Sequence, residues 1–250
     1  MDGIEHRLFG YIDGEEACSA ARWASDAKTA IANAHARDLL PILVGGTGLY
    51  VRVLLDGIAP IPEIAPEIRN DIRQLEVLEA YDALQQEDPV AAARLNATDR
   101  TRVQRALEVV RSTGKPLDHW QQHKTGGIGD DIVLHPLVQL PSREWLYRRC
   151  DLRFDEMIDH GAREEVERLV ARALPPNLPV MRAIGVSDIA AWLAGEISRE
   201  EAVERAKTAT RQYAKRQYTW FRNQSPAGWP RIEETLNNDI DAIIETILQH

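Results

Sequence analysis

Residues 39–44 have the sequence LLPILV and are followed directly by a glycine-rich turn, Gly45-Gly46-Thr47-Gly48. A short apolar run that ends in glycines is typical of a buried strand, and helical periodicity at 18–36 and 49–57 predicts a helix on either side of it. Helix, strand, glycine turn and helix in this order form the building unit of a parallel sheet. We therefore expect an α/β fold.

The glycine turn is also a candidate binding site. A turn between a strand and a helix presents backbone amides at the helix N-terminus, where an anionic or polar ligand can bind, with the Thr47 hydroxyl free to point into the site. However, a tight turn needs glycine whether or not a ligand binds, and GGTG matches neither GxGxxG nor GxxxxGK[ST]. Both interpretations of the turn remain open at this point.

A helical stretch follows the turn. The proline-punctuated segment 58–69 predicts a linker without regular helix, since proline interrupts helices. Three helices are expected after it, at 71–87, 89–95 and 100–112, the last capped by Asp99 (or Thr98) and ended by Gly114. The apolar run 132–140 then predicts a returning strand. We expect a core of residues 1–58 and 132–250, interrupted by a helical insertion at 59–131.

The C-terminal part of the chain is expected to be helical. Ser142 should cap a helix that ends at Gly161, and further helices are expected at 162–173, from 184 onward, and at 239–248. Arg143, Arg149 and Arg153 crowd the first half of the helix after Ser142. A guanidinium group there could bind phosphate oxygens through its fork of N–H donors.

One segment departs from the acidic character of the chain. The net charge is −9, yet residues 205–224 carry six basic side chains and no acidic one, so the other 230 residues hold −15. On a helix, Lys207, Arg211, Lys215, Tyr218 and Arg222 fall within one arc of about 80°. We expect this basic stripe to face outward, where cations and an aromatic ring suit RNA loops. An ordinary solvated helix face is the alternative.

Other classes of protein are excluded or disfavoured by the sequence. No apolar run approaches the ~20 residues of a membrane helix, and the first residues lack the pattern of a secretory signal. Two cysteines, Cys18 and Cys150, form neither a disulfide framework nor a zinc spacing, which favours a reducing compartment. We expect a cytoplasmic protein without membrane contact. His119 and His123 have the spacing of a helical zinc pair but no third ligand nearby, and we predict no metal-ligating residues.

Four segments together resemble a known family. They are LPILVGGTGLYVRVLLDGIAPIP (40–62), DPVAAARLNATDRTRVQRALEVVRSTGKPL (88–117), RAIG (182–185) and ATRQYAKRQYTWFRN (209–223). In this order they resemble the signature segments of tRNA dimethylallyltransferases, which transfer a dimethylallyl group from its diphosphate to N6 of the adenine next to the anticodon. The resemblance implies a P-loop-kinase-like parallel-sheet core of the ATP- and nucleotide-binding class, a helical insertion that binds the anticodon arm, Mg²⁺ at the diphosphate, and a monomer.

The resemblance also implies roles for individual residues. Thr47 matches the family's reaction-centre threonine, and Arg153 matches an arginine that holds the leaving diphosphate. The remaining matches are to residues that contact tRNA: Arg69; Thr101, Arg102, Val103, Gln104 and Arg105; Arg182; and Lys215, Arg216, Gln217, Tyr218, Thr219, Trp220, Phe221 and Arg222. The run Thr101 to Arg105 agrees with the pattern of its helix, on which Thr101 and Arg105 lie opposite the apolar face.

The sequence also departs from the family. The GxTxxGK[ST] loop that holds the diphosphate and a hydroxyl ligand for Mg²⁺, and the aspartate that follows it as general base, are not found among the 250 residues; the Gly114-Lys115 pair is followed by Pro116. We expect an N-terminally truncated member that lacks the first βα unit of the core and is poorly active or inactive. Smaller departures are Val186, where the family usually has tyrosine, and a slightly short insertion. Two alternatives remain: a non-catalytic tRNA-binding remnant, and an isopentenyltransferase acting on free adenine nucleotides.

Overall fold

The structure of the protein is a computed structural model that describes residues 3–233. The chain divides into two compact units. Unit 1 consists of Met1–Val51 together with Val133–His250, and unit 2 consists of Arg52–Ile132. The helix expected at 239–248 lies outside the described residues. None of the described helices is both long and apolar enough to cross a membrane.

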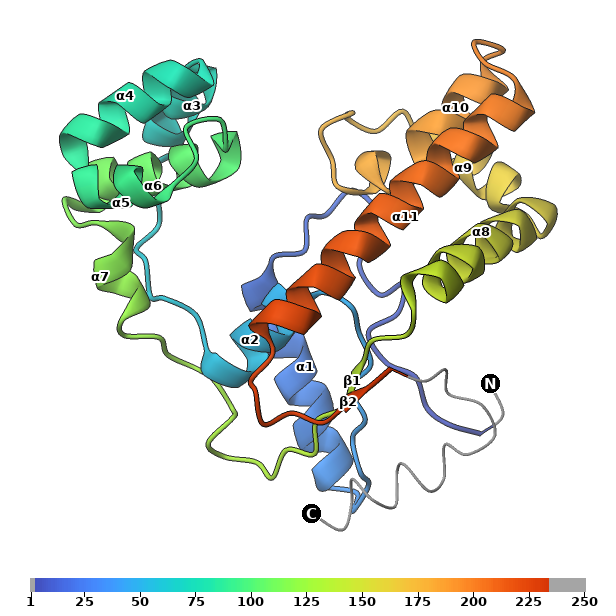
Figure 1. The fold of residues 1–250 in the computed structure, drawn as a ribbon, viewed down its shortest axis with the longest axis horizontal. Helices are drawn as coiled ribbons and strands as arrows, with labels where there is room; N and C mark the ends of the chain where they lie inside the picture. Colours follow the sequence, from blue (N-terminus) through green and yellow to red (C-terminus); the bar gives the residue numbers. More distant parts are fainter. Residues whose placement is uncertain (1–2, 234–250) are drawn as a thin grey trace. The chain divides into compact units, whose positions relative to one another are not determined.

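Unit 1 combines helices with a small parallel sheet (Figure 1). The two strands pair in parallel, with Val138 opposite Arg231 and Gln139 opposite Ile232. This pairing, together with the helices, confirms the expected α/β class. The elements are, in chain order, α1 (Ala20–His35), the first turn of α2 (Gly48–Asp56), β1 (Val138–Gln139), α8 (Arg143–Asp159), α9 (Ala162–Ala171), the 3-10 helix η1 (Val180–Arg182), α10 (Val186–Leu193), α11 (Arg199–Gln224) and β2 (Arg231–Ile232).

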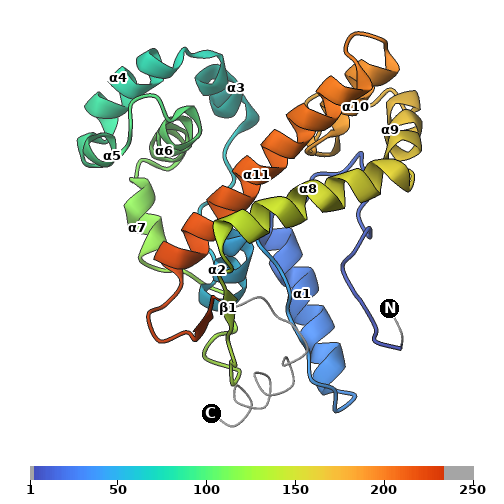
Figure 2. The same ribbon diagram turned by 45° about the vertical axis from the view of Figure 1, so that its right-hand side comes forward.

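The core of unit 1 lies where α8, α9, α10 and α11 meet. Figures 1 and 2 both show α11 running alongside α8 and α10. Each helix contributes to one cluster of buried side chains, including Phe154 of α8, Val166 of α9, Ile189 of α10 and Ala206 of α11. The small side chains of α11 at 202, 206 and 214 allow its neighbours to approach closely, because an alanine adds only a methyl group to the helix surface.

Of the two predicted strands, one does not form and the other forms only in part. The prediction of a buried strand at 39–44 is wrong for the described structure: these residues have no strand conformation, and Leu40, Ile42 and Val44 are 66%, 78% and 82% exposed. A strand needs a neighbour to accept and donate its backbone hydrogen bonds, and no described strand lies beside this segment. Of the strand expected at 132–140, only Val138–Gln139 pairs, through the Val138 N–H to Pro230 O and the Leu140 N–H to Ile232 O.

Unit 2 is a helical bundle around its own core. Its buried side chains come from four helices and include Ile72, Leu84, Val103 and Leu107, all 0% exposed. The linker expected at 58–69 ends earlier than predicted, because α3 begins at Pro66, where proline suits the first turn of a helix. The helices are α3 (Pro66–Gln74), α4 (Val77–Glu87), α5 (Pro89–Arg94), α6 (Arg100–Thr113) and α7 (Leu117–Gln121).

The predicted helix caps are largely confirmed. The Asp99 side chain accepts a hydrogen bond from the backbone N–H of Arg102, and Gly114 ends α6 in the left-handed region at φ 67°. Ser142 caps α8 in the same way, through the N–H of Trp145. These caps satisfy backbone groups that would otherwise lack partners at the helix ends. The helix expected at 71–87 is divided instead, since α3 ends at Gln74 and α4 begins at Val77.

Candidate functional site

The Thr47 turn lies at the N-terminus of α2, as the sequence predicted. Thr47 is exposed, and its carbonyl oxygen accepts the first helical hydrogen bond, from Tyr50 N at 2.9 Å. Its hydroxyl lies 3.5 Å from the Tyr213 hydroxyl of α11. Two hydroxyls therefore meet at the start of a helix, where backbone amides favour negative charge.

Helix α11 packs directly against this turn. A Cβ atom added to Gly46 would lie 2.3 Å from Gln217 Nε2, and one added to Gly48 would lie 2.1 Å from the Trp220 ring. Trp220 itself packs edge-to-face on Phe221, with ring centroids 4.9 Å apart. The glycines at 46 and 48 are thus explained by the close approach of α11, with or without a ligand. The packing brings Tyr213, Gln217 and Trp220 of α11 to the Thr47 turn.

The basic stripe of α11 does not face outward along its whole length, which corrects the sequence prediction. Lys207 and Arg211 face α8, with side chains only 16% and 26% exposed. Lys207 Nζ lies 2.6 Å from an Asp155 oxygen, and Arg211 donates to Asp151 at 2.8 Å. Partly buried cations need such partners. The carboxylates at 151 and 155 are one helical turn apart and match the spacing of the two cations.

The C-terminal half of α11 keeps its cations available. Lys215, Arg216 and Arg222 are exposed and form no ion pair with any described residue. The Arg216 guanidinium stacks over the Tyr213 ring at 5.5 Å, and Arg143 at the start of α8 lies over the Tyr218 ring at 5.2 Å. We call Arg143, Lys215, Arg216 and Arg222 the α11 cationic surface. It adjoins the residues that contact the Thr47 turn.

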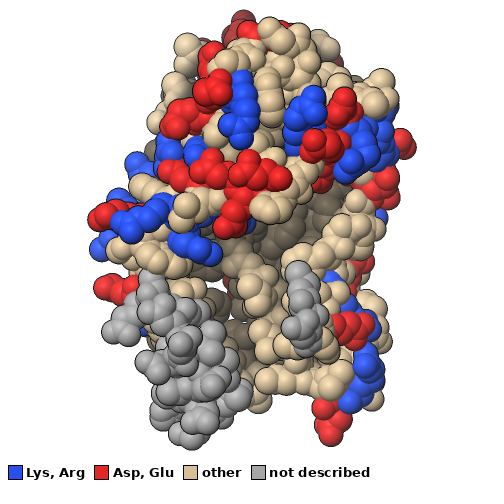
Figure 3. All heavy atoms as spheres, turned by 90° about the vertical axis from the view of Figure 1, so that its right-hand side faces the viewer, with Lys and Arg blue, Asp and Glu red and all other residues tan. Residues whose placement is uncertain are grey.

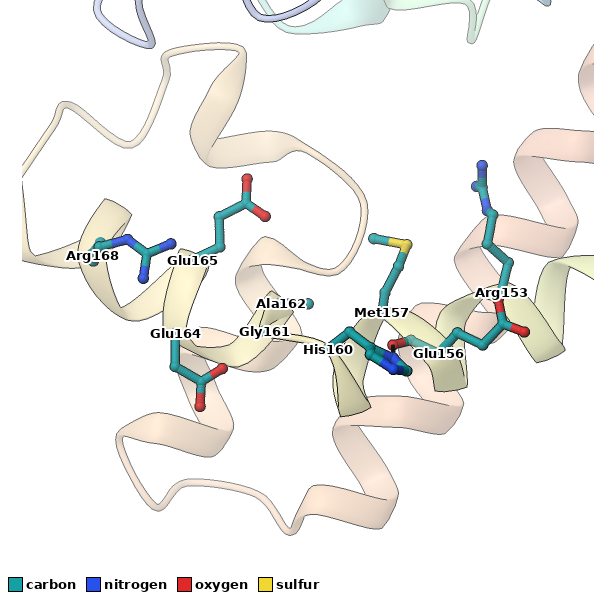
Figure 4. A pocket seen from close by; sticks show the side chains of 9 residues that line it. All are labelled: Arg153, Glu156, Met157, His160, Gly161, Ala162, Glu164, Glu165 and Arg168. Atoms are coloured by element: carbon teal, nitrogen blue, oxygen red, sulfur yellow. Dashed lines mark hydrogen bonds between the residues drawn. The ribbon is translucent and has the colours of Figure 1, made fainter. Parts of the chain in front are cut away.

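Arg153 lies elsewhere on α8, in an open pocket of about 660 Å³ formed by α8, α9 and the turn between them (Figure 4). Arg153 forms no hydrogen bond or ion pair with a described residue, and no described contact joins it to Thr47. The structure therefore does not bring these two predicted catalytic residues into contact. The pocket is lined by Arg153, Glu156, Met157, His160, Gly161, Ala162, Glu164, Glu165 and Arg168.

The charges around this pocket are mixed. Three glutamates face two arginines among its lining residues, which does not favour a diphosphate. Figure 3 shows the side of unit 1 that carries these helices, where acidic and basic side chains lie next to one another. Burial raises the pKa of the neighbouring Cys150 thiol, which disfavours its thiolate form.

In unit 2, the predicted tRNA contacts lie on α3 and α6. Thr101, Arg102 and Arg105 are exposed, and Arg69 is half-buried. The tRNA contact predicted for Val103 is corrected by the structure. Its side chain is 0% exposed within the core of unit 2 and cannot reach an RNA. Gln104 is also engaged, since its Nε2 donates to Ile72 O at 3.2 Å.

The other predicted contacts belong to unit 1. Arg182 is exposed and ends η1. Gly185 follows with φ 90°, and a Cβ atom there would lie 3.2 Å from the Phe154 ring. Thr219 is exposed, but its hydroxyl bonds to Lys215 O within α11.

The described residues include no cluster of acidic, histidine or cysteine side chains that could hold a metal ion by themselves. No three histidine, cysteine, aspartate or glutamate side chains of residues 3–233 gather closely enough to hold a metal. Divalent magnesium prefers oxygen ligands in octahedral geometry.

Three further residues of interest were not identified from the sequence. Tyr213 contacts Thr47, and Arg73 and Glu108 join α3 to α6, with Arg73 Nε 3.4 Å from Glu108 Oε1. A signal for Arg73 was present, because it follows Arg69 by one helical turn and so shares its face.

Comparison with known proteins gives a consistent result. The family model described as IPP transferase matches residues 1–224. The tRNA dimethylallyltransferase of Erythrobacter litoralis is 59% identical over 250 residues, which is 100% of this chain and 78% of the relative. That of Sphingopyxis alaskensis is 61% identical over 240 residues, or 96% of this chain and 78% of the relative.

Solved structures agree with these relatives. The tRNA isopentenylpyrophosphate transferase of Bacillus halodurans is 31% identical, with a TM-score of 0.65 over 100% of this chain and 80% of that chain. A eukaryotic dimethylallyltransferase acting on tRNA is 28% identical, with a TM-score of 0.71 over 88% of this chain and 56% of that chain.

Proposed function

The chain belongs to the IPP transferase family, and on that basis we propose that it acts on tRNA, with dimethylallyl diphosphate as the donor and N6 of the adenine adjacent to the anticodon as the acceptor. The proposal includes a cytoplasmic monomer. The observation that carries it is the packing of α11 on the Thr47 turn, because the residue matched to the reaction centre and a run matched to tRNA contacts adjoin each other.

In the proposed reaction, the adenine amine attacks the allylic carbon. The N6–C bond forms, the C–O bond to diphosphate breaks, and one amine proton passes to solvent water. The adenine must leave the base stack to react, since its N6 is not accessible inside a stacked loop. Thr47 would face the flipped base or the transferring carbon. The resemblance assigns the leaving diphosphate to Arg153, but three glutamates line the pocket of Arg153 and disfavour that anion, so the proposed step does not use Arg153.

The tRNA would be bound by the α11 cationic surface and by the exposed arginines of unit 2. Cations that lack ion pairs can neutralise phosphates without first breaking a bond within the protein, and the released counterions make such binding salt-dependent. Lys215, Arg216 and Arg222 meet that condition among the described residues.

The proposed tRNA binding can be tested with substitutions that are confined to helix α11. We expect Lys215→Ala with Arg222→Ala to weaken tRNA binding and to lower the slope of log K against log salt by about 0.7–0.9 for each lost phosphate contact. Arg205→Ala is the matched control, because Arg205 is on the same helix but already paired with Glu201 at 2.5 Å. Salt-independent binding, or equal effects of both variants, would contradict the proposal.

We further propose that the 250 residues themselves bind tRNA but transfer the group poorly or not at all, since they contain no GxTxxGK[ST] loop to hold the diphosphate. The test is incorporation of radiolabelled dimethylallyl group into tRNA by the purified chain. Robust turnover would overturn this part of the proposal and leave the binding part intact.

A free adenine nucleotide is the alternative acceptor. Competition distinguishes the two: if AMP displaces bound tRNA or is prenylated in preference to it, the tRNA proposal fails. Unit 2 argues for tRNA, because a separate helical unit with exposed arginines offers phosphate contacts that a mononucleotide does not need.

A further inference from the structure

Glu108 is one of two buried carboxylates of unit 2, and it lies in the middle of a helix, whereas the other, Asp88, caps α5 by accepting from the Ala91 N–H. Glu108 is 4% exposed and lies on α6 between Leu107 and Val109, both fully buried. A buried charge is costly unless it is paired. Two guanidinium groups supply that pairing: Arg73 of α3, whose Nε lies 3.4 Å from Glu108 Oε1, and Arg105 of α6, whose Nη1 lies 3.5 Å from Glu108 Oε2.

The two arginines remain accessible although their partner is buried. The side chains of Arg73 and Arg105 are 63% and 44% exposed, against 5% for that of Glu108. Arg73 uses Nε toward Glu108, so that its two terminal nitrogens keep their donors for another partner. One negative charge shared by two positive charges leaves this point of the surface net positive.

Two hydrogen bonds also join helices α3 and α6 near Glu108 and its two arginines. Gln104 Nε2 donates to Ile72 O, and Arg100 Nη2 donates to Leu75 O, so that α6 side chains satisfy carbonyl groups at the C-terminal end of α3. Ile72 O also accepts a hydrogen bond from the Leu75 N–H at 3.2 Å. The arginines of both helices are therefore held on one surface.

This surface joins two segments that the sequence matched to tRNA contacts separately. Arg69 lies one turn before Arg73 on α3, and Arg102 lies one turn before Arg105 on α6, so each pair shares a helix face. We call Arg69, Arg73, Arg102 and Arg105 the α3–α6 arginine cluster. Among residues 3–233, Glu108 is the only carboxylate that forms ion pairs with arginines of both α3 and α6.

We propose that Arg73 contacts a backbone phosphate of the bound RNA, and that Glu108 is a positioning residue that holds Arg73 and Arg105 in place for this contact. The inference rests on the proposed function, since it takes tRNA as the ligand. Arginine suits this role because its planar fork binds phosphate oxygens in a defined geometry, and pre-organised side chains lose less conformational entropy on binding.

The first test is Arg73→Ala in the full chain, with tRNA binding measured between 50 and 300 mM salt. Loss of one phosphate contact should lower the salt slope by about 0.7–0.9 and weaken binding about five- to eightfold at 0.1 M salt. Arg111→Ala is the control: Arg111 is on α6 of the same unit, but it binds Glu87 through both Nε and Nη2, whereas Arg73 binds Glu108 through Nε alone. Equal binding by the two variants would overturn the inference.

Glu108→Gln separates positioning from simple electrostatics. The substitution removes a negative charge near the RNA, so that charge alone predicts tighter binding, whereas loss of the anchor for two arginines predicts weaker binding. We expect at least a threefold loss, with a circular dichroism spectrum like that of the wild type. Tighter or unchanged binding would refute the positioning role. Arg73 is exposed, so its variant keeps the test valid if Glu108→Gln fails to fold.

The outcomes also separate this inference from the proposed function. If the unsubstituted chain binds no tRNA, the proposed function fails. If it binds tRNA with normal salt dependence and Arg73→Ala has no effect, the proposed function stands and the inference about Arg73 fails.

Discussion

Substitution of Gly48 by alanine tests the packing on which the candidate site depends. Gly48 is buried, and an added methyl group would lie 2.1 Å from two atoms of the Trp220 ring. Carbon atoms in contact are normally about 3.5–4.0 Å apart, so that the ring or the turn must move by about 1.5 Å. The ring has little room to rotate, because it packs against Phe221.

The expected cost follows from these contacts. Insertion of a methyl group into a packed site costs about 1–3 kcal/mol. Alanine is the better helix former by up to about 1 kcal/mol, which offsets part of this cost at the first residue of α2. We therefore expect Gly48→Ala to lower the free energy of unfolding by about 1–2 kcal/mol, which shifts Tm by roughly 2–8 °C for a chain of this size.

The same turn provides two controls. Nothing lies within 4 Å of a Cβ atom added to Gly45, so that Gly45→Ala should change stability by less than about 0.5 kcal/mol. Gly46→Ala should be intermediate, because it displaces only the flexible end of Gln217. Tryptophan fluorescence is a suitable signal, since five of the six tryptophans belong to unit 1.

The order of the three variants is the decisive result. If Gly48→Ala is as stable as Gly45→Ala, the packing of α11 on the turn is wrong, and the support it lends to the proposed function is lost. A double-mutant cycle with Trp220→Leu adds a check, because a smaller side chain should remove most of the cost of the methyl group and give a coupling energy above about 0.5 kcal/mol.

Further predictions concern both units. Leu84→Ala should cost unit 2 about 2–5 kcal/mol, measured by urea unfolding, because Leu84 is 0% exposed; a loss below 1 kcal/mol would contradict the core described here. Asp155→Asn should lower stability by about 1–2 kcal/mol, since Lys207 loses its charged partner, whereas Glu144→Gln, in an exposed pair, should have little effect; similar losses would refute the difference. Cys150 should react with iodoacetamide more slowly in the folded than in the unfolded chain at pH 8, in a variant whose other cysteine is serine, because its raised pKa lowers the thiolate fraction; equal rates would refute this.

Local signals in the sequence predicted helices well. Helix α6 begins after Asp99 and ends at Gly114, where the cap and the glycine indicated, because both features act within one turn of the chain. Residues 39–44 show the limit of such reasoning. Their apolar pattern indicates burial, but burial and strand pairing depend on a neighbouring strand, which the pattern of six residues does not contain.

The sequence pattern of α11 alone also could not show whether its basic stripe faces solvent or a neighbouring helix. A helical pattern identifies which residues share a face, but a charged face can point to solvent or to opposite charges on a neighbour. Here Asp151 and Asp155 of α8 bind Arg211 and Lys207. The sequence contains the matching spacing of the two acidic and the two basic residues. It does not show that α8 and α11 pack antiparallel, which is what brings each acidic residue to its basic partner.

This pairing explains how an acidic chain can present a positive surface for RNA. Of the six basic residues at 205–224, those in the N-terminal half are paired with carboxylates, and those in the C-terminal half are exposed without ion pairs to described residues. The exposed half is also the part of α11 that contacts the Thr47 turn. A phosphate bound there would displace no internal ion pair, whereas one bound near Arg211 would compete with Asp151 and Glu204. The net charge of −9 therefore carries less information about an RNA partner than the distribution of ion pairs along one helix.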